Sequence, residues 1–224
     1  MDKATAKFGF WSALLIGIFT LVFLVSLFFV PHFPYDRLGI YLARFRAAKV
    51  FPALPSLLIA LCHLPLFAAY KSFADEEKKI WASAGNLFGT AYVVCVSIVY
   101  FTQITYVAQS IRAGRTQYVE PFLLDNPLSY LRMQDMLGYL FLMIALFFWA
   151  RLFMEGPLDR WIRTFFWVTA VIGLMGVLGM ALQLPSLSVG ILFSAATYAV
   201  LAVLLIFRFA QGMKKHDSEK RRYL

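Results

Sequence analysis

"NPLSYLRMQDMLGYLFLMIALFFWARLF", Asn126 to Phe153, decides the fold of this chain. Its first ten residues include an arginine and an aspartate, and the remainder is almost entirely apolar. A helix needs about 20 apolar residues to cross the hydrocarbon core of a bilayer, and this stretch provides them. It therefore predicts a membrane-spanning helix with Arg132 and Asp135 at its polar end.

The rest of the chain repeats this pattern. Of its 224 residues, 61% are hydrophobic and only 15% are charged, and the mean hydropathy of +0.72 lies well above that of soluble globular proteins. The sequence predicts an all-α, polytopic transmembrane bundle of six helices. The expected spans are Phe8–Val30, Val50–Tyr70, Ile80–Ser110, Pro127–Phe153, Thr164–Leu184 and Leu187–Phe209.

The positive charges predict the orientation of the bundle. With both termini on one side, fourteen Lys and Arg residues fall on that side and seven on the other. Because cytoplasmic loops carry the excess of positive charge, both termini are expected on the cytoplasmic side of the membrane. Residues 1–210 form the expected transmembrane domain, and residues 211–224 form a basic, disordered cytoplasmic tail that contacts anionic lipids.

The net charge of +9 does not indicate nucleic-acid binding, because the basic residues lie in short loops and in the tail. The bilayer is the expected partner. A small molecule or lipid ligand and a membrane protein partner are further partners that the sequence allows.

Two connections on the outer side are longer than simple turns. Residues 31–49 place four apolar side chains on one helical face, which predicts a helix lying along the outer interface; a solvated loop is the alternative. These side chains are Leu38, Tyr41, Leu42 and Phe45. Residues 111–126 contain Phe122, Leu123 and Leu124 between charges, which indicates a loop that packs onto the bundle as a cap.

Polar side chains also gather at the outer ends of the third and fourth spans. Asn126 and Pro127 predict the N-cap and first position of the fourth helix. The spacing of Arg132, Asp135 and Tyr139 then puts these three side chains on one face and allows the two charges to pair.

The third span ends with a matching polar stripe, in which Gln103 and Tyr106 share a face and Tyr92 continues it. Polar groups in hydrocarbon are costly unless they have partners, so we expect the two stripes to face each other. They predict either an outward-facing ligand pocket or hydrogen bonds that only hold the two spans together.

His63 lies inside the second span and is a candidate intramembrane polar site, although its isolation favours a structural role. Cys62 and Cys95 are expected as small core residues. The histidines are too far apart in the expected topology to share a metal. No motif predicts a catalytic residue, a metal site or a cofactor, and the small residues Gly173, Gly176 and Gly179 favour close helix packing.

Four motifs resemble a family of uncharacterised bacterial integral membrane proteins with about six spans. They are "VYFTQIT" (99–105), "DNP" (125–127), "DMLGYLFL" (135–142) and "LDRWIR" (158–163). The resemblance covers roughly residues 92–184. It implies a bacterial inner membrane, and it assigns no activity or catalytic residue.

Three functions follow from these patterns, in order of preference. The first is binding of a small polar or amphipathic molecule or lipid in an outward-facing intramembrane pocket, as a transport subunit or sensor. The second is an accessory subunit that stabilises a larger membrane complex. The third is a lipid-modifying enzyme, which requires Asp135, Tyr139 and His63 to converge on one reacting atom.

Overall fold

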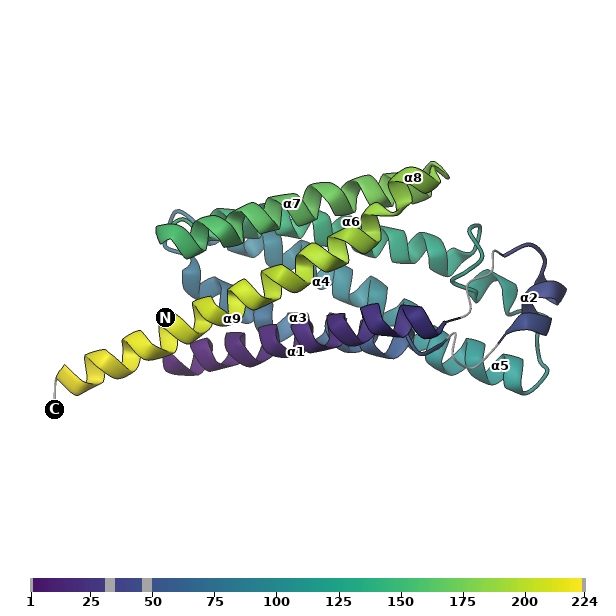
Figure 1. Cartoon of the computed structure of the whole chain (residues 1–224), viewed down its shortest axis with the longest axis horizontal. Coiled ribbons are helices and arrows are strands. Elements are labelled where there is room, and N and C mark those ends of the chain that lie inside the picture. Colours follow the sequence, from purple (N-terminus) through teal and green to yellow (C-terminus); the bar gives the residue numbers. More distant parts are fainter. Residues whose placement is uncertain (1, 31–34, 46–49, 223–224) are drawn as a thin grey trace.

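The computed structural model describes residues 2–30, 35–45 and 50–222, with side chains described as far as Lys214. These residues form helices, turns and loops, and no strand occurs among them (Figure 1). The long helices are α1 (Lys3–Phe29), α3 (Ala53–Tyr70), α4 (Lys79–Thr102), α6 (Tyr130–Trp149), α7 (Gly156–Ala181) and α9 (Gly190–Arg222). The shorter elements are α2 (Leu38–Arg44), η2 (Lys71–Phe73), η3 (Gln103–Val107), α5 (Ala108–Arg112), η4 (Glu120–Phe122), η5 (Ala150–Leu152) and α8 (Pro185–Ser188).

The all-α prediction and the six spans are confirmed. Six helical segments of the described chain are long and apolar enough to cross a membrane. They are Lys3–Phe29, Ala53–Phe73, Lys79–Arg112, Tyr130–Ala150, Gly156–Ala181 and Pro185–Lys214. The chain is therefore a multi-pass membrane protein.

The long helices form a ring in which each helix packs on its neighbour in sequence. α1 contacts α3, α3 contacts α4, α4 contacts α6, α6 contacts α7 and α7 contacts α9. Contacts between α9 and α1 close the ring. The N-terminal end of α1 and the C-terminal end of α9 lie at one end of the bundle, the terminal end; α2, α5 and α8 lie at the other, the cap end (Figure 1).

Helix α9 crosses the bundle obliquely and changes neighbours along its length (Figure 1). Near the cap end it lies against α7, where the backbone at Gly190 approaches that of Gly176 so closely that neither position has room for a Cβ. Near the terminal end it lies against α1, where the Phe209 ring occupies the space beside Gly9. The small residues of α7 therefore bring helices together within the bundle, as the sequence predicted.

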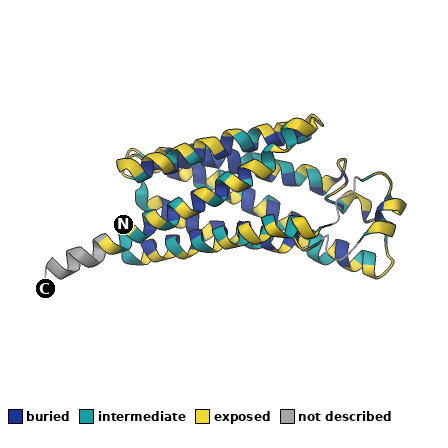
Figure 2. Cartoon of the chain, viewed as in Figure 1, coloured by how far each residue is buried: buried dark blue, intermediate teal, exposed yellow. Residues whose placement is uncertain are grey.

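Figure 2 shows the buried positions along the helices, and among those in the terminal half of the ring are several large aromatic residues. The Trp149 ring lies 4.5 Å from Phe67 and 5.1 Å from Tyr70, and its Nε1 donates to Oδ1 of Asn86 at 3.0 Å. At the same end, Nε of Arg208 donates to the buried Asp159 carboxylate at 2.5 Å, which ties α9 to α7. Packed aromatic rings thus occupy the interior of the terminal half.

The cap end is built differently, from α2 and the loop at 113–129. Tyr41 of α2, Val107, Val119 and Leu123 form a small separate core, and Leu38, Leu42 and Phe45 pack against it. The predicted apolar face of this connection is confirmed, although its helix covers only Leu38–Arg44. The expected helix also included residues 31–34 and 46–49, which lie outside the described part of the chain.

Two local predictions were wrong. Helix α6 begins at Tyr130, and its N-cap is Ser129, whose hydroxyl accepts from the backbone N–H of Arg132 at 3.0 Å. Asn126 instead accepts from the N–H of Leu128 and forms a turn, because a short polar side chain caps a turn as readily as a helix. The predicted disordered tail is also wrong, since α9 continues as a helix to Arg222.

Candidate functional site

A cavity of about 260 Å³ lies inside the cap end of the ring; we call it the cap cavity. All six long helices contribute to its walls, and α2 and the loop at 113–129 lie over it. Its polar lining residues are Tyr41, Tyr100, Gln103, Asp125, Arg132, Asp135 and Tyr139. Four of the five ligand-binding residues predicted from the sequence, Gln103, Arg132, Asp135 and Tyr139, are therefore in one cavity.

Asp135 is the most buried charged group of this cavity, with 5% of its surface exposed. Its Oδ1 is buried and has no hydrogen-bond partner among the described residues. Leaving such an atom unpaired costs about 1–3 kcal/mol, and more for a charged group. The hydrogen bonding of the Asp135 carboxylate is therefore incomplete in the protein alone.

Arg132 lies one turn before Asp135 on α6 and lines the same cavity. The expected pairing of the two charges is absent from the ion pairs of the described chain, although their spacing allows it. Nη2 of Arg132 instead contacts Sδ of Met180 on α7 at 2.9 Å, and a thioether is only a weak acceptor. Arg132 also borders a wider depression of about 580 Å³ between α6, α7 and α8, so its guanidinium lies between two hollows.

Gln103 and Tyr106 do not stay together as predicted. Gln103 lines the cap cavity and its Nε2 donates to the carbonyl of Phe122 in the cap loop at 2.5 Å. Tyr106 is 41% exposed and packs edge-on against the Phe122 ring. The reason is η3, a π-helical turn at Gln103–Val107, which advances fewer degrees per residue than an α-helix and rotates Tyr106 out of the stripe.

Tyr139 lies at the boundary between the cap cavity and a second, smaller one. Its hydroxyl lies 3.2 Å from the hydroxyl of Tyr100, and its ring is 5.9 Å from that of Tyr92. Tyr139, Phe23 and Ile191 line both cavities. The two cavities are thus adjacent compartments, separated by these three side chains.

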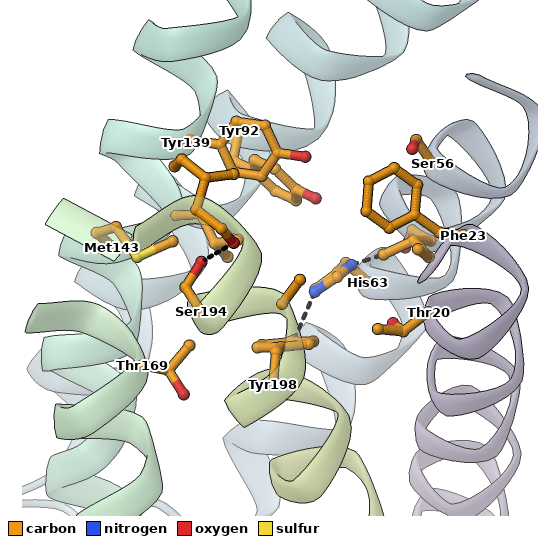
Figure 3. A pocket seen from close by; sticks show the side chains of 14 residues that line it. Thr20, Phe23, Ser56, His63, Tyr92, Tyr139, Met143, Thr169, Ser194 and Tyr198 are labelled. Carbon is orange, nitrogen blue, oxygen red and sulfur yellow. Dashed lines mark hydrogen bonds between the residues drawn. The ribbon is translucent and has the colours of Figure 1, made fainter. Parts of the chain in front are cut away.

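The second cavity, the His63 chamber, has a volume of about 70 Å³ (Figure 3). Hydroxyl-bearing side chains from all six long helices line it, together with the imidazole of His63. The lining residues that carry them are Thr20, Ser56, Tyr92, Tyr139, Thr169, Ser194 and Tyr198. Ser56 and Ser194 donate to backbone carbonyls of their own helices, whereas the buried hydroxyl of Thr20 has no partner in the described chain.

His63 is 1% exposed, and both of its ring nitrogens are bonded. Nδ1 lies 2.7 Å from the carbonyl oxygen of Ile59, and Nε2 lies 2.5 Å from the hydroxyl of Tyr198 (Figure 3). A carbonyl oxygen only accepts, so Nδ1 carries the proton and Nε2 accepts from Tyr198. The geometry thus assigns a neutral imidazole whose hydrogen bonds join α3 to α9.

Sequence reasoning missed several residues of these cavities. Tyr198 lies 135 positions after His63, and no local spacing connects them. Tyr100 is three residues before Gln103, so the polar stripe on α4 could have been extended to it. Tyr41 was assigned to an apolar face, but its hydroxyl donates to Asp125 at 2.8 Å. An amphipathic residue such as tyrosine satisfies both descriptions.

The cap is held by two tyrosine–carboxylate hydrogen bonds. Tyr35 donates to Glu120, and Tyr41 donates to Asp125. Partial burial and the neighbouring Glu120 carboxylate raise the pKa of Tyr35 to about 12, and burial beside Asp125 raises the pKa of Tyr41 further. Both phenols are therefore protonated donors throughout the physiological range.

The described residues contain no group of three or more His, Cys, Asp or Glu side chains placed to hold a metal ion. Cys62 and Cys95 are free thiols, each half-buried. Asp135 and His63 line different cavities, with Tyr139 between them. The three residues that an enzymatic mechanism would need are thus divided between two compartments.

No protein-family model, curated protein or solved structure matches this chain.

Proposed function

We propose that this chain binds a small polar or amphipathic molecule, or a membrane lipid, in the cap cavity, as a transport subunit or sensor. The observation that carries the proposal is Asp135: its buried Oδ1 has no hydrogen-bond partner among the described residues, and the residue lines a cavity of about 260 Å³. Unsatisfied polar groups aimed into a cavity are typical of ligand sites. Gln103 and Arg132 supply further donors on the same wall.

The proposed orientation places the cap end outside the cytoplasm. It follows from the distribution of Lys and Arg, which favours the terminal end as the cytoplasmic one. In this orientation the cap cavity faces outward, and the packed aromatic rings around Trp149 lie between it and the cytoplasm.

The test is a search for ligands that stabilise the purified full chain, followed by the Asp135→Asn variant. A ligand that binds the folded state raises the unfolding temperature by mass action. If the cap cavity is the site, Asp135→Asn weakens this stabilisation and preserves the fold. If Asp135 only clasps helices together, the same change lowers the unfolding temperature equally with and without ligand, and the proposal fails.

The accessory-subunit and enzyme hypotheses are less well supported. An accessory subunit would copurify with a partner and would leave no unsatisfied group in its own cavity, contrary to the state of Asp135. A lipid-modifying enzyme would need Asp135 and His63 at one reacting atom, whereas they line separate cavities.

A further inference from the structure

The charges of the cap cavity suggest what kind of ligand completes it. Its described walls carry one guanidinium, Arg132, and two carboxylates, Asp125 and Asp135. Asp125 lies at the exposed edge and accepts from Tyr41. The two charged groups on α6, Arg132 and Asp135, form no ion pair within the described chain.

Asp135 requires a hydrogen-bond donor. Its carboxylate is an acceptor only, and its Oδ1 is buried without a partner. The Tyr100 hydroxyl lies 3.2 Å from that of Tyr139 and also interacts with the Asp135 carboxylate, but Oδ1 is still without a partner. A ligand ammonium with free N–H groups would supply both the donor and the compensating positive charge.

Arg132 requires an acceptor. Its guanidinium has five N–H donors, and the only hydrogen bond from them in the described chain goes to the Met180 thioether. Phosphate and carboxylate oxygens match a guanidinium in geometry and charge. Since Arg132 and Asp135 are one helical turn apart, a single small group could reach both.

The apolar walls of the same cavity indicate how such a group could be attached to a longer molecule. Phe23 and Leu27 of α1, with Val30 directly after it, form one side, and Ile191 of α9 forms another. These two helices pack against each other near the terminal end, and at the cap end α9 lies against α7 instead (Figure 1). The cavity therefore lies at the end of the ring where α1 and α9 diverge (Figure 1).

We infer that the cap cavity binds a zwitterionic group, with a primary ammonium at Asp135 and a phosphate or carboxylate at Arg132. This inference rests on the proposed function and specifies its ligand class. The group is either the headgroup of an aminophospholipid, whose chains leave between α1 and α9, or a free small zwitterion of the same chemistry.

The experiment measures the affinity of the detergent-purified full chain for four probes. Dihexanoyl-phosphatidylethanolamine carries both charges and N–H donors. Dihexanoyl-phosphatidylcholine has an ammonium without N–H groups, and dihexanoyl-phosphatidylglycerol has only the phosphate charge. O-Phosphoethanolamine has the zwitterion without chains. We expect the ethanolamine lipid to bind about tenfold to a hundredfold more tightly than the choline and glycerol lipids, since the ammonium–carboxylate hydrogen bond is charge-assisted.

Variants assign this selectivity to the two side chains. Asp135→Asn should reduce the affinity for the ethanolamine lipid to that for the glycerol lipid, whereas Arg132→Gln should weaken all phosphate-containing probes. Asp36→Asn and Arg112→Gln are matched controls, because both residues are exposed and neither lines the cap cavity. Unfolding temperatures without probe show that each variant is folded.

The outcomes distinguish a lipid headgroup from a free zwitterion, and failure of this inference from failure of the proposed function. Equal binding of O-phosphoethanolamine and the ethanolamine lipid identifies a free zwitterion, and binding of the lipid alone identifies a headgroup; both support the inference. Equal affinity for ethanolamine and glycerol lipids, or selectivity that survives in Asp135→Asn, overturns it. If only a probe without a zwitterion binds, and its binding depends on Asp135, the zwitterion inference fails and the proposed function of the cap cavity is retained. If neither these probes nor a wider ligand screen stabilises the chain, both fail.

Discussion

His63 and Asp135 both lie within the membrane-spanning part of the bundle, and their surroundings differ. Both imidazole nitrogens of His63 are bonded, to Ile59 and Tyr198. The buried Oδ1 of Asp135 has no partner in the described chain. In hydrocarbon, a satisfied polar group joins helices, whereas an unsatisfied one adjoining a cavity is a candidate contact for a ligand.

The structural role of His63 can be tested through its partner. Tyr198→Phe removes the donor to Nε2 and should lower the free energy of unfolding by about 1–3 kcal/mol. His63→Gln or His63→Asn should be tolerated better than His63→Leu, because an amide retains a donor or an acceptor. Thermal unfolding in detergent measures all four. A double variant, His63→Leu with Tyr198→Phe, should cost less than the sum of its parts.

The prediction is contradicted if these substitutions leave the unfolding temperature unchanged but abolish ligand binding. His63 would then belong to the functional site, and the two cavities would act as one.

At the scale of elements, the contact between α7 and α9 depends on glycine. A Cβ on Gly176 would lie 2.8 Å from the carbonyl carbon of Gly190, and a backbone cannot yield as a flexible side chain does. On the other side of α9, a Cβ on Gly17 would lie 3.6 Å from Cβ of Ala202, which is an ordinary contact. The two glycines thus provide a matched pair of sites.

Gly176→Ala should therefore reduce the free energy of unfolding by about 1–3 kcal/mol, as overpacked substitutions do, while Gly17→Ala should be neutral or slightly stabilising. Thermal or denaturant unfolding of both variants in the same detergent is the measurement. Similar losses for the two substitutions would show that helix contact at Gly176 is looser than described.

The cap carries a pH dependence at its tyrosine hydrogen bonds. The pKa of Tyr35 is raised from the ordinary 10 to about 12, so the folded cap favours the protonated phenol. The stabilisation is fully present below pH 10 and is lost as the pH rises through about 12. The unfolding temperature should therefore fall more steeply between pH 10 and 12 in the wild type than in Tyr35→Phe.

A direct check is phenolate absorbance. Subtracting the titration of Tyr35→Phe from that of the wild type should reveal one phenol that ionises near pH 12. A difference curve centred near pH 10, the ordinary tyrosine value, would show that Glu120 does not hold Tyr35.

The sequence predicted the six spans because each is determined by its own composition, and a run of apolar residues needs no distant partner to be recognised. It predicted four residues of the cap cavity because helical spacing brings them to common faces. Tyr106 lies on a different face because the helix has a π-helical turn at Gln103–Val107, and no pattern in "QITYV" predicts such a turn. His63 and Tyr198 could not be matched at all, since their contact depends on how α9 crosses the ring.

For the whole molecule, topology is the property to measure. Single cysteines at Ser218 and Thr116, in a background without Cys62 and Cys95, should be labelled from opposite sides of the membrane. We expect an impermeant maleimide to reach the Thr116 position from outside and the Ser218 position only after the membrane is opened. Labelling of both positions from outside intact cells would exclude the proposed orientation.

The closed ring has a consequence for biogenesis. Each long helix packs on the one synthesised before it, and the contacts between α9 and α1 join the last long helix of the described chain to the first. During synthesis, α1, α3, α4, α6 and α7 therefore enter the bilayer as an open arc, and α9 completes the circle afterwards. Because α9 supplies Ile191 to the cavity that Arg132 and Asp135 line, the wall of this cavity is complete only after α9 has inserted.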